Sequence, residues 1–126
     1  MEDKVIEDVL KELAETVYSE LGVGYSERVY HNAMEVLLRE NNFKYETERI
    51  VPVSFKNHII GNVRADIVVE NEIILELKAV STINELMVHQ LKTYIKHTGI
   101  KKGILINFTQ SNDEQKLVLQ YKFLST

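Results

Sequence analysis

Two charged residues interrupt an apolar segment near the middle of the chain and form the strongest candidate for chemistry. Residues 73–80 read Ile-Ile-Leu-Glu-Leu-Lys-Ala-Val, the composition of a buried β-strand apart from Glu76 and Lys78. Alternation along a strand places these two side chains on one face, about 7 Å apart. Because a central strand rarely buries charges without a reason, the pair indicates a site.

The preceding strand-like segment supplies a second acid, since it is interrupted by Arg64 and Asp66. If residues 70–72 form a three-residue hairpin loop, counting outward from the loop places Asp66 opposite Glu76. The same count places Arg64 opposite Lys78, and a two-residue loop or a bulge would shift both pairs. Like charges facing each other destabilise a sheet and push one of two carboxylates toward protonation.

A divalent cation would resolve the conflict between the carboxylates. Mg²⁺ and Mn²⁺ prefer oxygen ligands and keep several waters, so Asp66, Glu76 and the backbone carbonyl of Leu77 could form half of an octahedral site. Lys78 could then position or deprotonate an attacking water and neutralise a phosphorane-like transition state. The alternative is that these are ordinary surface ion pairs on a half-exposed strand.

Periodicity predicts three helices around these strands. Apolar residues recur at three- and four-residue steps over residues 3–20, before Gly22 and Gly24 break the pattern. A second helix is expected from Ser26, as its N-cap, to Asn41-Asn42. A third is expected over residues 84–98, where Gly99 stops it.

Short β-branched runs predict the sheet. Residues 51–55, 59–69 and 73–80 read as an antiparallel meander, which residues 43–48 could extend. A buried strand is expected over residues 103–108. Apolar residues alternate with mostly polar ones near the end of the chain, which predicts a last strand. The apolar positions are Leu117, Leu119, Tyr121 and Phe123.

Composition limits the class of protein. The 126 residues suit one domain spanning 1–126, and 44% apolar with 27% charged residues is typical of a folded soluble chain. The absence of cysteine excludes disulfides, thiolate zinc sites and a cysteine nucleophile. No apolar run approaches the ~20 residues that span a bilayer, and the start does not resemble a signal peptide. A cytoplasmic location without membrane attachment is therefore expected.

Charge is distributed unevenly along the chain. The formal net charge is −4, but residues 1–20 hold seven acids against two lysines, so the remaining 106 residues sum to +1. The segment from Lys92 to Lys102 contains no acid; its basic residues are Lys92, Lys96, His97, Lys101 and Lys102. This run could steer a phosphate backbone, or it could be a solvated helix face.

Four motifs in one order resemble the GxxExxY family of the PD-(D/E)XK nuclease superfamily. The resemblance covers about Leu10 to Phe108, and the combination of motifs is more specific than any one of them. They are Gly24-Tyr-Ser-Glu27-Arg-Val-Tyr30, Arg64-Ala-Asp66, Glu76-Leu-Lys78-Ala-Val, and Gln90-Leu-Lys-Thr-Tyr94 followed by Gly103-Ile-Leu-Ile-Asn-Phe108.

The resemblance implies a restriction-endonuclease-like α/β sandwich: a central mixed sheet, containing the antiparallel meander, flanked by helices. It also implies roles for single residues. Asp66 and Glu76 would be metal ligands and Lys78 the catalytic lysine. Glu27 would be a further acid that contacts the metal directly or through water, although it also suits the first turn of a helix. Gln90 would approach the metal from the following helix.

Other residues give weaker indications. Tyr94 lies one turn after Gln90 and could line the site or pack in the core, while Tyr30 is expected in the core. The histidines lack metal-ligand spacing and are expected at the surface or partly buried; they are His31, His58, His89 and His97.

The function expected from these observations is Mg²⁺- or Mn²⁺-dependent hydrolysis of phosphodiester bonds, most simply in DNA. Two alternatives remain open. One is an idle nuclease-like module that binds nucleic acid or a protein, and the other is an enzyme acting on RNA or on a nucleotide-sized phosphodiester. A small domain offers little surface to grip a duplex. The nuclease function is therefore compatible with a homodimer or with work beside a larger nucleic-acid partner.

Overall fold

The computed structural model describes residues 3–126, with side chains from Ile6 onward. Met1 and Glu2, the latter one of the acids counted above, lie outside the described residues. The helices are α1 (Asp3–Leu21), α2 (Glu27–Glu40), α3 (Glu85–Thr98) and the 3₁₀ helix η1 (Glu114–Lys116). The strands are β1 (Tyr45–Phe55), β2 (His58–Val69), β3 (Ile73–Lys78), β4 (Lys102–Asn107) and β5 (Gln120–Ser125).

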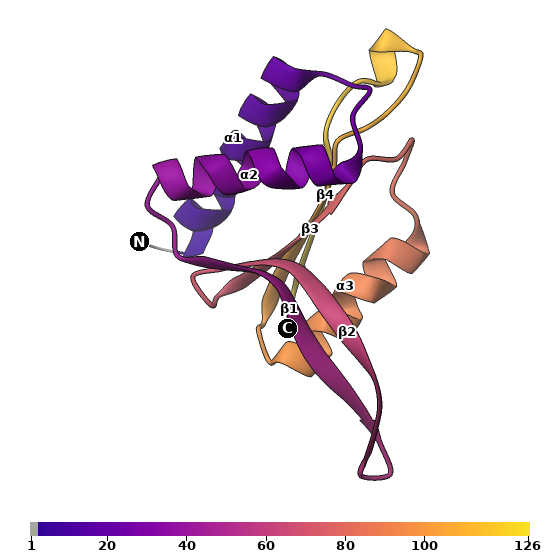
Figure 1. The fold of residues 1–126 in the computed structure, drawn as a ribbon. Coiled ribbons are helices and arrows are strands. Elements are labelled where there is room, and N and C mark those ends of the chain that lie inside the picture. The colour runs from indigo at the N-terminus through magenta and orange to yellow at the C-terminus, as the bar shows by residue number, and fades with distance from the viewer. Residues whose placement is uncertain (1–2) are drawn as a thin grey trace.

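The five strands form one mixed sheet in the order β1-β2-β3-β4-β5. The pair β3–β4 is parallel, and α3 makes the crossover between its strands; the other neighbouring pairs are antiparallel. Helices α1 and α2 cover one face of the sheet, and α3 covers the other (Figure 1). This is the predicted restriction-endonuclease-like α/β sandwich.

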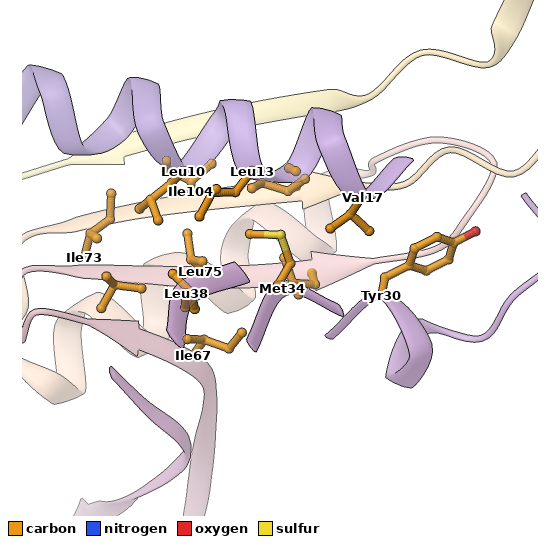
Figure 2. Packing of buried hydrophobic residues seen from close by; sticks show 14 of the residues in the cluster. Leu10, Leu13, Val17, Tyr30, Met34, Leu38, Ile67, Ile73, Leu75 and Ile104 are labelled. Carbon is orange, nitrogen blue, oxygen red and sulfur yellow. The ribbon is translucent and has the colours of Figure 1, made fainter. Parts of the chain in front are cut away.

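Each face of the sheet has its own core. The larger core joins α1 and α2 to the strands. Figure 2 shows Leu10 and Leu13 of α1 and Met34 and Leu38 of α2 directed toward the sheet residues Ile67, Leu75 and Ile104. The smaller core joins α3 to the opposite face. Its buried members are Ala65, Val68, Ile74, Val88, Leu91, Ile95, Ile100 and Leu105.

Local signals explain where the helices begin and end. Ser26 precedes α2 in an extended conformation, as an N-cap position requires, although its side chain makes no capping bond. Asn84 caps α3 by accepting from the Met87 N–H. Gly99 ends α3 in the left-handed conformation (φ 77°), which suits a residue without a Cβ.

Two predicted boundaries differ from the structure. Residues 43–48 and 51–55 are not separate strands, because β1 runs without a break from Tyr45 to Phe55. The last strand begins only at Gln120, so Leu117 and Leu119 precede it; η1 ends at Lys116, just before the predicted segment, and a bend lies at Val118. The alternation there reflects the burial of Leu119 in the larger core rather than strand pairing.

None of the helices within residues 3–126 combines the length and apolar character needed to span a bilayer.

Gly103 sets how closely α3 approaches the sheet. A Cβ at this position would lie 2.6 Å from Leu91 Cδ1 and 3.2 Å from Ile95 Cδ1. Since Leu91 is fully buried, we expect Gly103→Ala to push α3 outward and lower the free energy of unfolding by about 1–3 kcal/mol. Urea denaturation measures the change.

Gly61→Ala is the matched control, because Gly61 also lies in a strand and a Cβ there meets nothing within 4 Å. Its free energy of unfolding should stay within about 0.5 kcal/mol of the wild-type value. Equal stabilities for the two variants would contradict the close approach at Gly103.

Candidate active site

Strand β2 rotates about its axis at Asp66. Ile67 lies in the core under α1 and α2, whereas Ala65 lies in the core under α3. Residues two positions apart share a face in a regular strand, so the chain turns over between them. The ladder with β1 skips this point, and Glu48 has a positive φ of 53° there. The irregularity frees Asp66 from the sheet pairing on both sides.

The ladder between β2 and β3 also stops before Asp66. Val69 faces Ile73, as the predicted three-residue loop requires, and the last pair is Ile67 with Leu75. The predicted extension of this register, in which Asp66 and Arg64 oppose Glu76 and Lys78, is therefore wrong. Rotation at Asp66 separates the strands.

Arg64 pairs with Ile50 of β1 on the other side of β2, and the β2–β3 ladder does not reach it.

Two carboxylates replace the lost ladder bonds. The Asp66 N–H donates to Oε1 of Glu76 at 2.8 Å, and the Leu77 N–H donates to Oδ2 of Asp66 at 3.1 Å. Each acid thus accepts from backbone on the opposite strand. The structure brings the predicted pair of carboxylates together, although not by the predicted pairing.

The charged form of Glu76 is disfavoured at this position. It is only 5% exposed; burial and then the Asp66 charge raise its pKa to about 8, while the Asp66 N–H and Lys78 act in the opposite direction. Lys78, two residues along the strand, is partly exposed. Burial and the neighbouring acid thus disfavour the charged form of Glu76, and Lys78 offsets only part of this effect.

Helix α2 adds a residue that the sequence analysis missed. His31 is 2% exposed, so the prediction of a surface or partly buried residue is wrong for it. Its Nδ1 lies 2.7 Å from Oδ1 of Asp66, and this bond raises the pKa of His31. Its Nε2 lies 3.0 Å from Oε2 of Glu35 without the alignment of a hydrogen bond. The available signal was the spacing of Glu27, His31 and Glu35, which puts them on one face of a helix.

Glu27 lies at the rim of the same site. Partial burial raises its pKa, Lys78 lowers it and Asp66 raises it, so its carboxylate is within electrostatic range of both. A cleft of about 240 Å³ opens here, lined by Glu27, Arg28, His31 and Asp66. Arg28 forms an ion pair with Glu48, the residue at the irregular point of β1.

The Gly24–Tyr30 segment positions Glu27 through Gln110. The Gly24 N–H donates to Oε1 of Gln110 at 2.8 Å, and Nε2 of Gln110 donates to the Tyr30 hydroxyl at 3.0 Å. Tyr30 is fully buried, as predicted, and its hydroxyl donates to the Gly22 carbonyl. The loop before α2 is therefore attached to the segment after β4, which fixes where the first turn of α2 places Glu27.

Helix α3 approaches the site from the other face. Burial, followed by the charges of Glu76, Asp66 and Glu27, raises the pKa of Tyr94 to about 12. Tyr94 packs against the smaller core, which confirms the expectation of core packing, and it is also within electrostatic range of the three acids. Gln90, one turn earlier, is exposed. His58 and His89 are exposed and His97 is partly buried, as expected.

The donor set suits a hard divalent cation. Carboxylate groups come together from β2 and β3, and burial, followed by the Asp66 charge, raises the pKa of Glu76; a bound cation would favour its ionised form. Within residues 3–126, no three His, Asp or Glu side chains are already arranged as a metal site. Asp66 instead uses its oxygens for His31 and the Leu77 N–H. Cation binding would exchange some of these bonds for coordination.

The raised pKa of Glu76 predicts a pH-dependent stability. Because the folded state holds this proton more tightly than the unfolded state, stability from Glu76 is fully present below its unfolded pKa and falls as pH rises toward about 8. With EDTA present, we expect the wild type to lose on the order of 2 kcal/mol between pH 6 and 8. Urea denaturation across this range measures it.

Glu76→Gln should flatten the profile, since the amide keeps the Oε1 acceptor without the charge. Some slope should remain, because the raised pKa of His31 acts with the same sign. Parallel stability profiles for the wild type and Glu76→Gln would rule out a raised pKa at Glu76.

No curated protein matches this chain. Among solved structures, the protein SSO0001 aligns with a TM-score of 0.56 and 18% identity, covering 96% of this chain and 77% of the other. An alkaline exonuclease (LHK-Exo) from Laribacter hongkongensis aligns with a TM-score of 0.55 and 9% identity, covering 94% of this chain and 68% of the other.

Both structural likenesses concern the fold, since the identities are low. A sequence profile described as the PD-(D/E)XK nuclease superfamily matches residues 4–118, nearly the whole chain. This match includes the strands that carry Asp66, Glu76 and Lys78. The chain therefore belongs to the PD-(D/E)XK nuclease superfamily.

Proposed function

We propose that this protein is a Mg²⁺- or Mn²⁺-dependent nuclease that hydrolyses phosphodiester bonds in DNA. The observation that carries the proposal is the convergence of Asp66 and Glu76 where β2 leaves β3, with Lys78 within electrostatic range. Superfamily membership supports a nucleic-acid substrate. We also assign the chain to the GxxExxY family, supported by the spacing of Gly24, Glu27 and Tyr30.

The residues divide the work. Asp66, Glu76 and the Leu77 carbonyl would hold the cation, and Glu27 would add an acid from α2, directly or through water. A bound Mg²⁺ or Mn²⁺ would polarise the scissile phosphate and lower the pKa of water in the site.

The flanking side chains orient this centre. His31 holds one oxygen of Asp66 and so fixes the rotation of its carboxylate. Lys78 orients the attacking water and stabilises the charge that develops on the phosphate. Gln90 approaches from α3, one turn from Tyr94, and contacts the substrate or the water shell.

Metal binding tests the carboxylate roles separately from catalysis. We expect Asp66→Asn and Glu76→Gln each to weaken Mn²⁺ binding at least ~10-fold, because each removes an anionic oxygen ligand. Isothermal titration calorimetry measures the affinity, and circular dichroism checks the fold.

Glu114→Gln is the matched control, since Glu114 is an exposed acid in η1. Its Mn²⁺ affinity should equal that of the wild type. A Mn²⁺ affinity unchanged in Asp66→Asn and Glu76→Gln would place the metal elsewhere.

Cleavage assays test the reaction. The purified protein is offered single-stranded, duplex and branched DNA, and RNA, each with Mg²⁺ or Mn²⁺. We expect it to cut DNA. Lys78→Ala should lower the rate by ~10²–10³-fold while keeping fold and Mn²⁺ affinity, because it removes one donor to the developing charge. Lys122→Ala is the control, since Lys122 is exposed on β5.

Each contrary outcome has its own meaning. Equal cutting by wild type and Lys78→Ala would indicate a contaminating nuclease or another site. Metal binding without cleavage of any substrate would favour an idle binding module, and cleavage of RNA alone would favour a ribonuclease.

A further inference from the structure

The outer part of the β1–β2 hairpin, residues 50–64, projects beyond the body of the protein; we call it the arm. Figure 1 shows it as a twisted two-stranded ribbon that extends past the helices. Its strands pair with each other from Ile50 with Arg64 to Phe55 with His58, and residues Lys56 and Asn57 make a tight turn with positive φ. The arm is a regular ribbon rather than an irregular loop.

Large apolar side chains are exposed on the arm. Ile59 is 70% exposed, Ile60 64%, and Ile50 and Phe55 each 59%. These residues account for four of the eleven large hydrophobic residues exposed in the described chain. Apolar side chains gathered on a projecting element mark an interaction surface.

The charge of the arm is opposite to that of the rest of the protein. It contains Lys56, Arg64 and His58, but none of the chain's 19 acidic residues. With two of the 15 basic residues, the arm carries +2 and the remainder of the chain −6. A polyanion would meet favourable charge on this element, whereas −5 of the opposing −6 lies in residues 1–20.

The arm continues directly into the candidate active site. Arg64 lies two residues before Asp66 on the same strand, and it is within electrostatic range of Glu48, which pairs with Arg28 at the cleft. From Asp66 to the turn at Asn57 the strand covers nine residues, about 30 Å at ~3.3 Å per residue. This is close to the ~34 Å of one turn of B-DNA.

We propose that the arm binds a nucleic-acid duplex and aligns it with the cleft at Asp66. This inference rests on the proposed function, since it takes a nucleic acid as the substrate. A two-stranded ribbon fits the major groove. Arg64 and Lys56 contact phosphates, and Ile50 and Ile60 contact base edges and thymine methyl groups. Strand alternation and the pairing of Ile50 with Arg64 place these two isoleucines on one face of the ribbon.

A second copy of the chain is a poorer occupant. Strand β1 is an edge of the sheet, but Pro52 lacks the N–H that edge pairing needs, and a register shift at Val53/Ser54 twists the edge. Both features oppose the addition of a strand from another copy. Groove binding leaves the edge unpaired and is compatible with them.

Fluorescence anisotropy with a labelled 20-base-pair duplex in EDTA tests the arm without cleavage. We expect the wild type to bind the duplex more tightly than the single strand. The double variant Lys56→Gln/Arg64→Gln should weaken binding at least ~10-fold and lower the slope of log Kd against log salt by about 2. Ile59→Ser/Ile60→Ser should weaken binding without changing the slope.

Lys116→Gln/Lys122→Gln is the matched control, because it removes the same charge from exposed positions on η1 and β5. It should lower affinity much less than the arm variant. Circular dichroism and urea denaturation should show wild-type stability for both, since all four side chains are exposed.

Several outcomes would overturn the proposal: no duplex binding by the wild type, equal affinity for single strand and duplex, or equal losses in the arm and control variants. A dimer in sedimentation that Ile59→Ser/Ile60→Ser converts to monomer would assign the arm to a second copy. Cleavage is scored separately with Mn²⁺. If the arm variants lose duplex binding but the wild type cleaves no substrate, the role of the arm stands and the proposed function is refuted. If the wild type cleaves DNA but the arm variants bind the duplex as tightly as it does, the proposed function stands and the role of the arm is refuted.

Discussion

Two carboxylates lie where β2 turns away from β3, and the hydrogen bonds that the sheet gives up there are made by the acids themselves. Asp66 and Glu76 each accept from backbone across the gap. This arrangement satisfies the backbone of a broken ladder but concentrates negative charge in a buried place. The neighbouring basic residues act on these acids: Lys78 lowers the pKa of Glu76 and of Glu27, and His31 forms a hydrogen bond with Asp66.

The two cores make this electrostatic strain tolerable. One joins α1 and α2 to the sheet and the other joins α3 to its opposite face, so β2 and β3 are held before and after the gap. The close approach of α3 over Gly103 brings Tyr94 within range of the acids. Since burying a charge without a partner costs several kcal/mol, such a site requires a rigid surrounding structure. The apolar packing supplies it.

Periodicity in the sequence predicted most of the fold. Steps of three and four residues located all three α-helices, and the loop length fixed the pairing of Val69 with Ile73. The rotation at Asp66 was not predictable, because alternation assumes a regular strand and the twist depends on which helix covers each residue. His31 was missed for a related reason: its importance comes from facing Asp66, which lies 35 residues away. The tail misled because the burial of Leu119 resembles strand alternation.

In the proposed function, the distribution of charge assigns recognition and chemistry to different residues. A site built from Asp66, Glu76 and Glu27 repels a phosphate backbone until a cation compensates it, so these residues cannot by themselves attract a nucleic acid. Attraction must come from basic residues outside the site. On α3, Lys92 and Lys96 are exposed, but Lys102 lies 3.8 Å from an acid of α1, Glu7, which reduces what that run can offer. The arm contains no acid, although Arg64 at its base is within electrostatic range of Glu48. It leads along β2 to Asp66, so the strand that supplies a carboxylate would also guide the substrate to it.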